Sequence, residues 1–128
     1  MFFKPLKNTG PLHFFLDIFS TTRPRAQKEL IISLLTNNPS YGLLNAWSEL
    51  EHEVKARTKL SGVKSKNEQI ISECERSLSL AKSEVTRLQS LSRTRNGVAH
   101  ALDDRKSPKW GDVIFVLRIT KKYRKLKK

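Results

Sequence analysis

The stretch PSYGLLNAWSELEHEV at residues 39–54 decides the fold. It carries large apolar residues at spacings of four, three and four positions, namely Leu43, Trp47, Leu50 and Val54. These spacings place the four side chains on one face of an α-helix. A proline disfavours helical geometry in the residue before it, so Pro39 ends any preceding helix. We therefore predict a long helix that begins at Ser40 and runs to about residue 60, with Gly62 as its stop.

Helical periodicity also appears on both sides of this stretch. We expect further helices at residues 23–36, 65–80, 84–102 and 108–125, with Thr22, Ser83 and Ser107 as caps. The segment from Val113 to Leu117 is rich in residue types that favour strands. A strand there would have no partner, because nothing else in the chain alternates convincingly between apolar and polar residues. The sequence therefore predicts an all-α bundle of four to five helices.

The chain has 128 residues, a length typical of one domain. Residues 1–21 contain two prolines, a glycine, several phenylalanines and no clean period. We expect them to form an irregular, aromatic-rich arm with at most a short helix at 12–19, and residues 22–128 to form the helical domain. The apolar runs are too short to cross a membrane, and Asp17 interrupts the run near the N-terminus. We therefore expect neither a membrane span nor a signal peptide.

Cys74 is the single cysteine, which excludes an internal disulfide and fits a reducing, cytoplasmic location. With one cysteine and three histidines, a structural zinc site is not expected. The sequence also lacks a glycine-rich phosphate loop, a carboxylate cluster for Mg²⁺ and a recognisable Ser/His/Asp set. We therefore expect neither a metal nor another cofactor.

The charge balance points to a polyanionic partner. The chain holds 25 Lys and Arg against 12 Asp and Glu, a net charge of +13. Residues 118–128 contain seven of these bases and no acid. This run is either a solvated tail or a surface that follows phosphates, whose affinity would fall with salt. The candidate nucleic-acid contacts are Arg93, Arg118, Lys121, Lys122, Arg124 and Lys125.

The helix expected at 84–102 carries Arg95-Asn96-Gly97-Val98-Ala99-His100 near its end. On a helical wheel, Arg95 falls inside the apolar stripe of that helix, which consists of Leu88, Leu91, Ala99 and Leu102. Asn96 and His100 are four residues apart and lie along one border of the stripe. One turn of helix therefore presents an inward cation beside two polar residues. Arginine supplies a fixed cation for a phosphate, and histidine supplies a proton carrier.

An inward arginine needs a carboxylate partner, because an unpaired buried charge is costly. We expect that partner on the 40–60 helix, with Glu51 as the first choice and Glu49 as the second. Three interpretations stay open. Arg95 and His100 form a catalytic pair, or Arg95 is purely structural and its spacing from His100 arises by chance. The third is a helix-turn-helix DNA-binding domain, which short helices and strong positive charge would suit.

The motif at 95–100 resembles the Arg-x4-His motif of HEPN domains. These are all-α bundles that often act as metal-independent ribonucleases, as toxins of toxin–antitoxin pairs and in antiviral defence. Residues 39–51 are similar to the helix that precedes the motif helix in one bacterial branch, which carries an Ala-Trp-x-x-Leu-Glu core. Residues 83–100 are similar to its Leu-x-x-Leu-x-x-x-Arg-Asn-x-x-x-His helix, and Ser107-Pro108 with the segment after it matches the closing helix. The resemblance covers roughly residues 23–125.

The resemblance implies a homodimer that brings two Arg95/His100 pairs together, with RNA between them. In that arrangement His100 would transfer protons and Arg95 would hold the scissile phosphate. Asn96 would orient His100 or donate to the phosphate, and Glu51 would hold Arg95. The products would be a 2′,3′-cyclic phosphate and a 5′-hydroxyl, and a cognate antitoxin protein is a further expected partner. The resemblance also allows a HEPN-like module without catalysis that serves in RNA binding or assembly.

Overall fold

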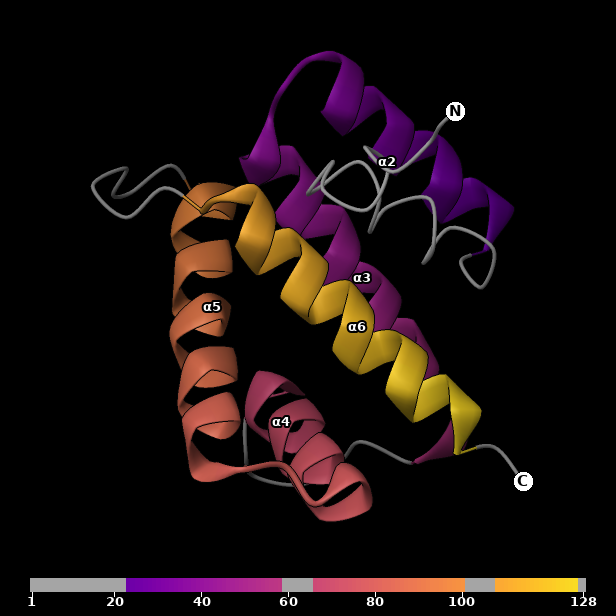
Figure 1. The fold of residues 1–128 in the computed structure, drawn as a ribbon, viewed down its shortest axis with the longest axis vertical. Coiled ribbons are helices and arrows are strands. Elements are labelled where there is room, and N and C mark those ends of the chain that lie inside the picture. Colours follow the sequence, from indigo (N-terminus) through magenta and orange to yellow (C-terminus); the bar gives the residue numbers. More distant parts are fainter. Residues whose placement is uncertain (1–22, 59–65, 101–107, 127–128) are drawn as a thin grey trace, which may run out of the picture.

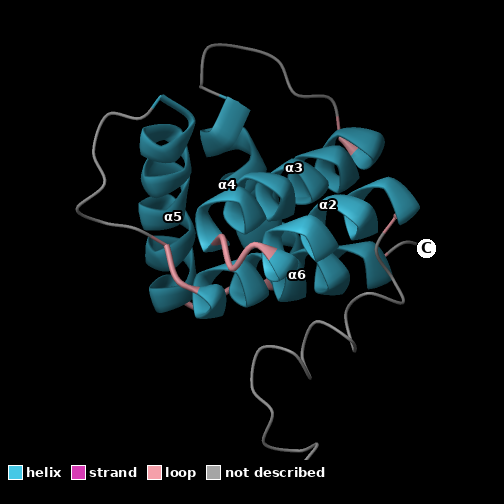
Figure 2. Cartoon of the chain, turned by 90° about the horizontal axis from the view of Figure 1, so that it is seen from above, coloured by secondary structure: helices cyan, strands magenta, loops and turns pink. Residues whose placement is uncertain are grey.

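The computed structural model describes residues 23–58, 66–100 and 108–126, and for residues 97–100 it describes the backbone only. These residues form five α-helices and no strand (Figure 1 and Figure 2). The helices are α2 (Pro24–Leu35), α3 (Pro39–Arg57), α4 (Lys66–Leu78), α5 (Lys82–His100) and α6 (Trp110–Lys125). The predicted all-α bundle is confirmed. The predicted arm at 1–21 lies outside the described residues.

The helices α3 and α6 lie side by side and run in the same direction (Figure 1). At their first turns, Gly42 of α3 lies so close to α6 that an added Cβ would be 3.4 Å from a methyl of Val113. At their last turns, the Arg57 guanidinium of α3 donates to the backbone carbonyl of Tyr123 in α6. The helices α2 and α5 lie on opposite sides of α3 (Figure 1 and Figure 2).

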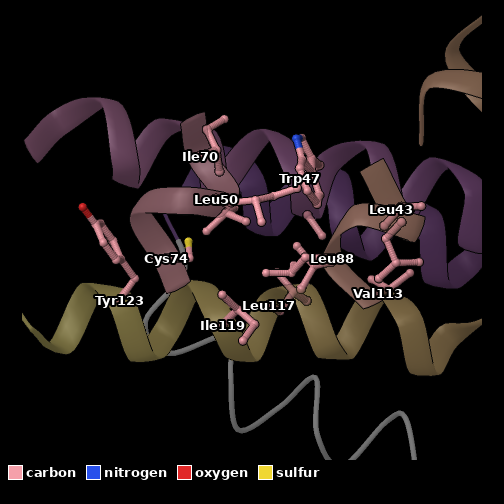
Figure 3. Packing of buried hydrophobic residues seen from close by; sticks show 14 of the residues in the cluster. Leu43, Trp47, Leu50, Ile70, Cys74, Leu88, Val113, Leu117, Ile119 and Tyr123 are labelled. Atoms are coloured by element: carbon pink, nitrogen blue, oxygen red, sulfur yellow. The ribbon is translucent and has the colours of Figure 1, made fainter. Parts of the chain in front are cut away.

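One cluster of buried apolar side chains joins the helices (Figure 3). It contains the whole predicted face of α3, because Leu43, Trp47, Leu50 and Val54 are each 0% exposed. From α5 it contains Leu88 and Leu91, two members of the predicted stripe. The hydrophobic effect across this cluster stabilises the bundle, and each fully buried large apolar side chain contributes about 1.5–3 kcal/mol.

The strand-like segment from Val113 to Leu117 lies in α6. Four of its five residues are buried, because α6 packs against both α3 and α4. Three of them, Val113, Ile114 and Val116, are β-branched and weaken an isolated helix slightly. Burial on two sides outweighs that cost, since packing routinely overrides intrinsic propensity. The choice of a helix over a lone strand is therefore confirmed.

The predicted start of each of the five helices differs from the observed start by one or two residues. The helix predicted from Ser40 begins at Pro39, and the Asn38 side chain caps it by accepting from the Tyr41 N–H at 3.0 Å. Asparagine is as good a cap as serine, and proline suits the first helical position, where its missing N–H costs nothing. The helix predicted from residue 23 begins at Pro24, and its N-cap residue, Arg23, makes no side-chain cap bond. Thr22 lies outside the described residues.

The caps predicted for α5 and α6 are also different. The helix α5 begins at Lys82, so the predicted cap Ser83 lies inside it, and the Glu84 carboxylate accepts from the Ala81 N–H at 2.9 Å. In α6 the Asp112 carboxylate accepts from the Lys109 N–H at 3.0 Å, and the helix begins at Trp110. A carboxylate in the first turn satisfies an unpaired backbone donor and favours the positive end of the helix dipole. Ser107 lies outside the described residues.

None of the helices in the described ranges combines the length and apolar character that a membrane crossing requires.

Candidate functional site

A polar cleft of about 560 Å³ lies between α3, α4 and α5. Its walls come from Glu51 of α3, from Lys66, Asn67, Glu68 and Ile71 of α4, and from Gln89, Ser92, Arg93, Arg95 and Asn96 of α5. The volume falls within the range of small-molecule and nucleotide sites. Three of the predicted site residues, Arg95, Asn96 and Arg93, therefore lie on one wall of this cleft. The three cations on its walls outnumber the two carboxylates.

Arg95 is partly buried in the cleft wall. Its Nη1 donates to the Asn96 side-chain oxygen at 3.2 Å. Its Nε is buried and has no hydrogen-bond partner among the described residues. A buried donor without a partner costs about 1–3 kcal/mol, so such groups in native proteins deserve a functional or structural explanation.

The prediction of an ion pair between Arg95 and Glu51 is wrong, since the ion pairs of the described residues do not include it. The Glu51 carboxylate instead accepts from Lys66 at 3.0 Å and from Lys55 at 3.1 Å, through the same oxygen. Burial raises the pKa of Glu51, but the hydrogen bonds and charges of the two lysines outweigh it and leave that pKa below its ordinary value. The Glu51–Lys55 pair follows from their spacing of four positions on one helix, whereas Lys66 comes from α4.

Glu49, the second predicted partner of Arg95, lies in a different cluster. It is 1% exposed, and its carboxylate binds Arg23 at 2.8 Å and Arg124 at 2.9 Å. Arg124 also donates to Glu53 at 2.9 Å. On a helical wheel, positions 49 and 53 are about 40° apart, whereas position 51 is about 160° from both. Glu49 and Glu53 therefore lie on one flank of α3, and Glu51 lies on the flank that meets α4.

The basic surface of α6 is separate from the cleft. Arg118, Lys122 and Lys125 are exposed and Lys121 is partly buried. None of the α6 residues lines the cleft between α3, α4 and α5. Arg124 was predicted as a nucleic-acid contact, but its ion pairs with Glu49 and Glu53 make it part of the fold. A run of lysines and arginines on a helix does not show which member turns inward, because the inward position depends on where the partner acids lie.

His100 is the last residue of α5, and its side chain lies outside what the structure describes. Its backbone continues the same helix one turn beyond Asn96. Four-residue spacing on one helix makes the two positions neighbours on its surface. The motif helix is therefore continuous from the apolar stripe at Leu88 to His100, as predicted.

Lys66 and Asn67 are among the cleft-lining residues that sequence reasoning missed. Lys66 reaches the cleft from the first turn of α4, and the only sequence signal was its place in a polar segment. Asn67 also lines the cleft, and its side-chain oxygen accepts from the indole N–H of buried Trp47 at 3.0 Å. An indole nitrogen only donates, so this bond sets the Asn67 oxygen toward Trp47 and leaves the amide NH₂ on the other side.

The described residues contain no group of three or more His, Cys, Asp or Glu side chains placed to hold a metal ion. Comparison of the chain with protein-family models, curated proteins and solved structures finds no match.

Proposed function

We propose that the protein is a HEPN-like, metal-independent RNA endonuclease that works in the cytoplasm, and that the cleft beside Arg95 receives the RNA phosphate. The observation that carries this proposal is the state of Arg95. Arg95 lines an open polar cleft, and neither predicted carboxylate neutralises it. A guanidinium in this position suits a phosphate, since its planar set of donors matches two phosphate oxygens.

The chemistry follows from the residue types. The 2′-hydroxyl of a ribose attacks the adjacent phosphorus, a new P–O2′ bond forms, and the P–O5′ bond breaks. One proton leaves the 2′-oxygen and one reaches the 5′-oxygen, so the products are a 2′,3′-cyclic phosphate and a 5′-hydroxyl. His100 carries these protons, because an imidazole has an ordinary pKa near 6.5 and exchanges protons at neutral pH.

Arg95 and Asn96 act on the phosphate. Arg95 holds it and stabilises the charge that builds on its oxygens in the transition state. The Asn96 side-chain oxygen already accepts from Arg95, which leaves its NH₂ group to donate to the phosphate or to His100. The 3.2 Å bond also restrains the arginine before RNA binds, and a restrained group needs less ordering in the reaction.

The assembly is part of the same proposal. Two copies pair about a two-fold axis, so that two Arg95/His100 pairs lie on either side of one RNA strand. An antitoxin protein that covers this surface would silence the activity. The net charge of +13 favours association with a polyanion and steers the RNA toward the protein.

The test is single-turnover cleavage of a mixed RNA pool in excess EDTA. Arg95→Ala and His100→Ala should each lose about 10²- to 10⁴-fold in rate, the usual effect of removing one catalytic group. The matched control for His100 is His52→Ala, because His52 is exposed on α3 and does not line the cleft. The control for Arg95 is Arg25→Ala on the exposed face of α2.

The outcomes separate the candidate functions. Equal cleavage by wild type and His100→Ala, or cleavage that requires added Mg²⁺, refutes the mechanism. Binding of RNA without cleavage would favour the non-catalytic HEPN-like module. Preference for duplex DNA over RNA, with no effect of Arg95→Ala, would favour a basic DNA-binding domain.

A further inference from the structure

Two lysines share one carboxylate oxygen but lie in different surroundings. Lys55 and Lys66 bind the same Glu51 oxygen at 3.1 and 3.0 Å, and their side chains are 49% and 52% exposed. Only Lys66 lines the cleft. Glu51 is much less exposed than either lysine, at 18%, and it binds the ammonium of Lys66 in the cleft wall.

Lys66 and Arg95 approach the cleft from different helices. Lys66 comes from the first turn of α4, and Arg95 comes from the second half of α5. They are close enough to repel each other, since the charge of Arg95 opposes the rise that Glu51 causes in the pKa of Lys66. Two cations held near each other across an open cleft favour a ligand that carries negative charge between them.

The carboxylates of the cleft do not cancel this preference. Glu51 is neutralised by two lysines, so the group of three has a net positive charge. Glu68 is the other acid on the wall, and Arg93 is a further cation there. A cleft of about 560 Å³ is larger than one phosphate needs and leaves room for a sugar and a neighbouring phosphate.

We propose that Lys66 and Arg95 bind consecutive phosphates of one RNA strand, and that Glu51 is the positioning residue that holds Lys66 over the cleft. The proposal rests on the proposed function for the identity of the ligand as RNA. It assigns a phosphate contact to α4, a helix outside the Arg-x4-His motif. Binding would then join α4 to α5 across the strand.

The experiment measures binding without cleavage. The probe is a fluorescein-labelled, single-stranded 2′-O-methyl RNA of about ten nucleotides, which lacks the nucleophilic hydroxyl. Fluorescence anisotropy gives the affinity of the full chain between about 50 and 200 mM salt. The variants are Lys66→Met, Lys55→Met, Glu51→Gln and Arg95→Met. Melting by circular dichroism verifies that each variant is folded at the assay temperature.

Lys66→Met and Lys55→Met each remove one positive charge and one bond to the same Glu51 oxygen. A loss of net charge alone would therefore weaken binding equally in both variants. We expect Lys66→Met to weaken binding about tenfold and Lys55→Met about twofold or less. The slope of log affinity against log salt should fall by about 0.7 for Lys66→Met, the value for one phosphate contact on a single strand. Glu51→Gln should weaken binding less than Lys66→Met, because the lysine remains but is no longer held.

Equal losses in Lys66→Met and Lys55→Met, or an unchanged salt slope in Lys66→Met, overturn the proposal. So does wild-type affinity in Lys66→Met. These outcomes are independent of catalysis. If RNA is not cleaved but the difference between the two lysine variants appears, the endonuclease proposal fails and this one stands. If RNA is cleaved but the two lysine variants bind alike, the endonuclease proposal stands and the proposal for Lys66 fails.

Discussion

Replacement of Glu49 by glutamine tests whether the buried ion pairs hold the bundle together. The substitution keeps the size of the side chain and removes its charge. The carboxylate is 1% exposed and accepts from Arg23 through Nε at 2.9 Å and through Nη2 at 2.8 Å. It also accepts from Arg124 Nη2 at 2.9 Å. A glutamine offers one oxygen to these donors and turns an NH₂ group toward the other arginine.

The expected loss follows from the geometry. Removing one partner of a buried ion pair costs roughly 3–5 kcal/mol, because the remaining charge is left without compensation. The Arg23 and Arg124 side chains are 41% and 21% exposed, so water can solvate part of each guanidinium once the carboxylate is lost. This places the loss at the lower end, about 3 kcal/mol. For a chain of this length, that corresponds to a fall of about 10 °C in Tm.

The assay is urea unfolding followed by circular dichroism. Glu49→Gln should lower the midpoint without a change in the denaturant slope, which would show a change in stability rather than in the unfolded state. The matched control is Glu51→Gln on the opposite flank of α3. Its lysine partners are about half exposed, and surface ion pairs contribute little. A loss in Glu49→Gln no larger than the loss in Glu51→Gln would refute the reasoning.

Three further predictions concern stability. Gly111→Ala should stabilise the protein by about 0.5–1 kcal/mol, since a Cβ there meets nothing within 4 Å and alanine favours the helix. Gly42→Ala should destabilise the protein by about 1 kcal/mol, because the alanine Cβ would be 3.2 Å from the Trp110 ring and the overpacking outweighs the higher helix propensity of alanine. The urea midpoints of the two glycine variants test both predictions. Burial raises the pKa of Glu73, but hydrogen bonds from Arg76, Ser77 and Tyr123 outweigh it and hold that pKa below its ordinary value. The stabilisation that Glu73 contributes is therefore present above the ordinary pKa of a glutamate and is lost as the pH falls through the lowered pKa. Glu73→Gln should flatten the acid side of a stability–pH curve, and an unchanged curve would contradict this.

The helices could be predicted from the sequence because their signal is local and repeated. The face formed by Leu43, Trp47, Leu50 and Val54 identifies α3 without knowledge of its neighbours, and all four residues are buried. The helix starts were less predictable. Asn38, Pro39 and Ser40 each suit a helix start, and a single hydrogen bond, from the Tyr41 N–H to Asn38, decides among them.

The ion pairs were the least predictable part of the site. Three acids at positions 49, 51 and 53 have similar local sequence, yet their partners come from different parts of the chain. Glu49 binds arginines 26 and 75 residues away, and Glu51 binds Lys66, which is 15 residues away. Such pairs depend on which helices meet each flank of α3. A wheel separates the flanks, but it does not show what packs against them.

The two flanks of α3 have different partners. The flank with Glu49 and Glu53 joins the start of α2 at Arg23 to the last turn of α6 at Arg124. The flank with Glu51 meets the cleft, and there the acid binds two lysines instead of Arg95. On α3 the acids that bind arginines, Glu49 and Glu53, lie on the flank away from the cleft. Because neither Glu49 nor Glu51 is spent on Arg95, the cleft wall keeps the positive charge that our proposal assigns to a phosphate.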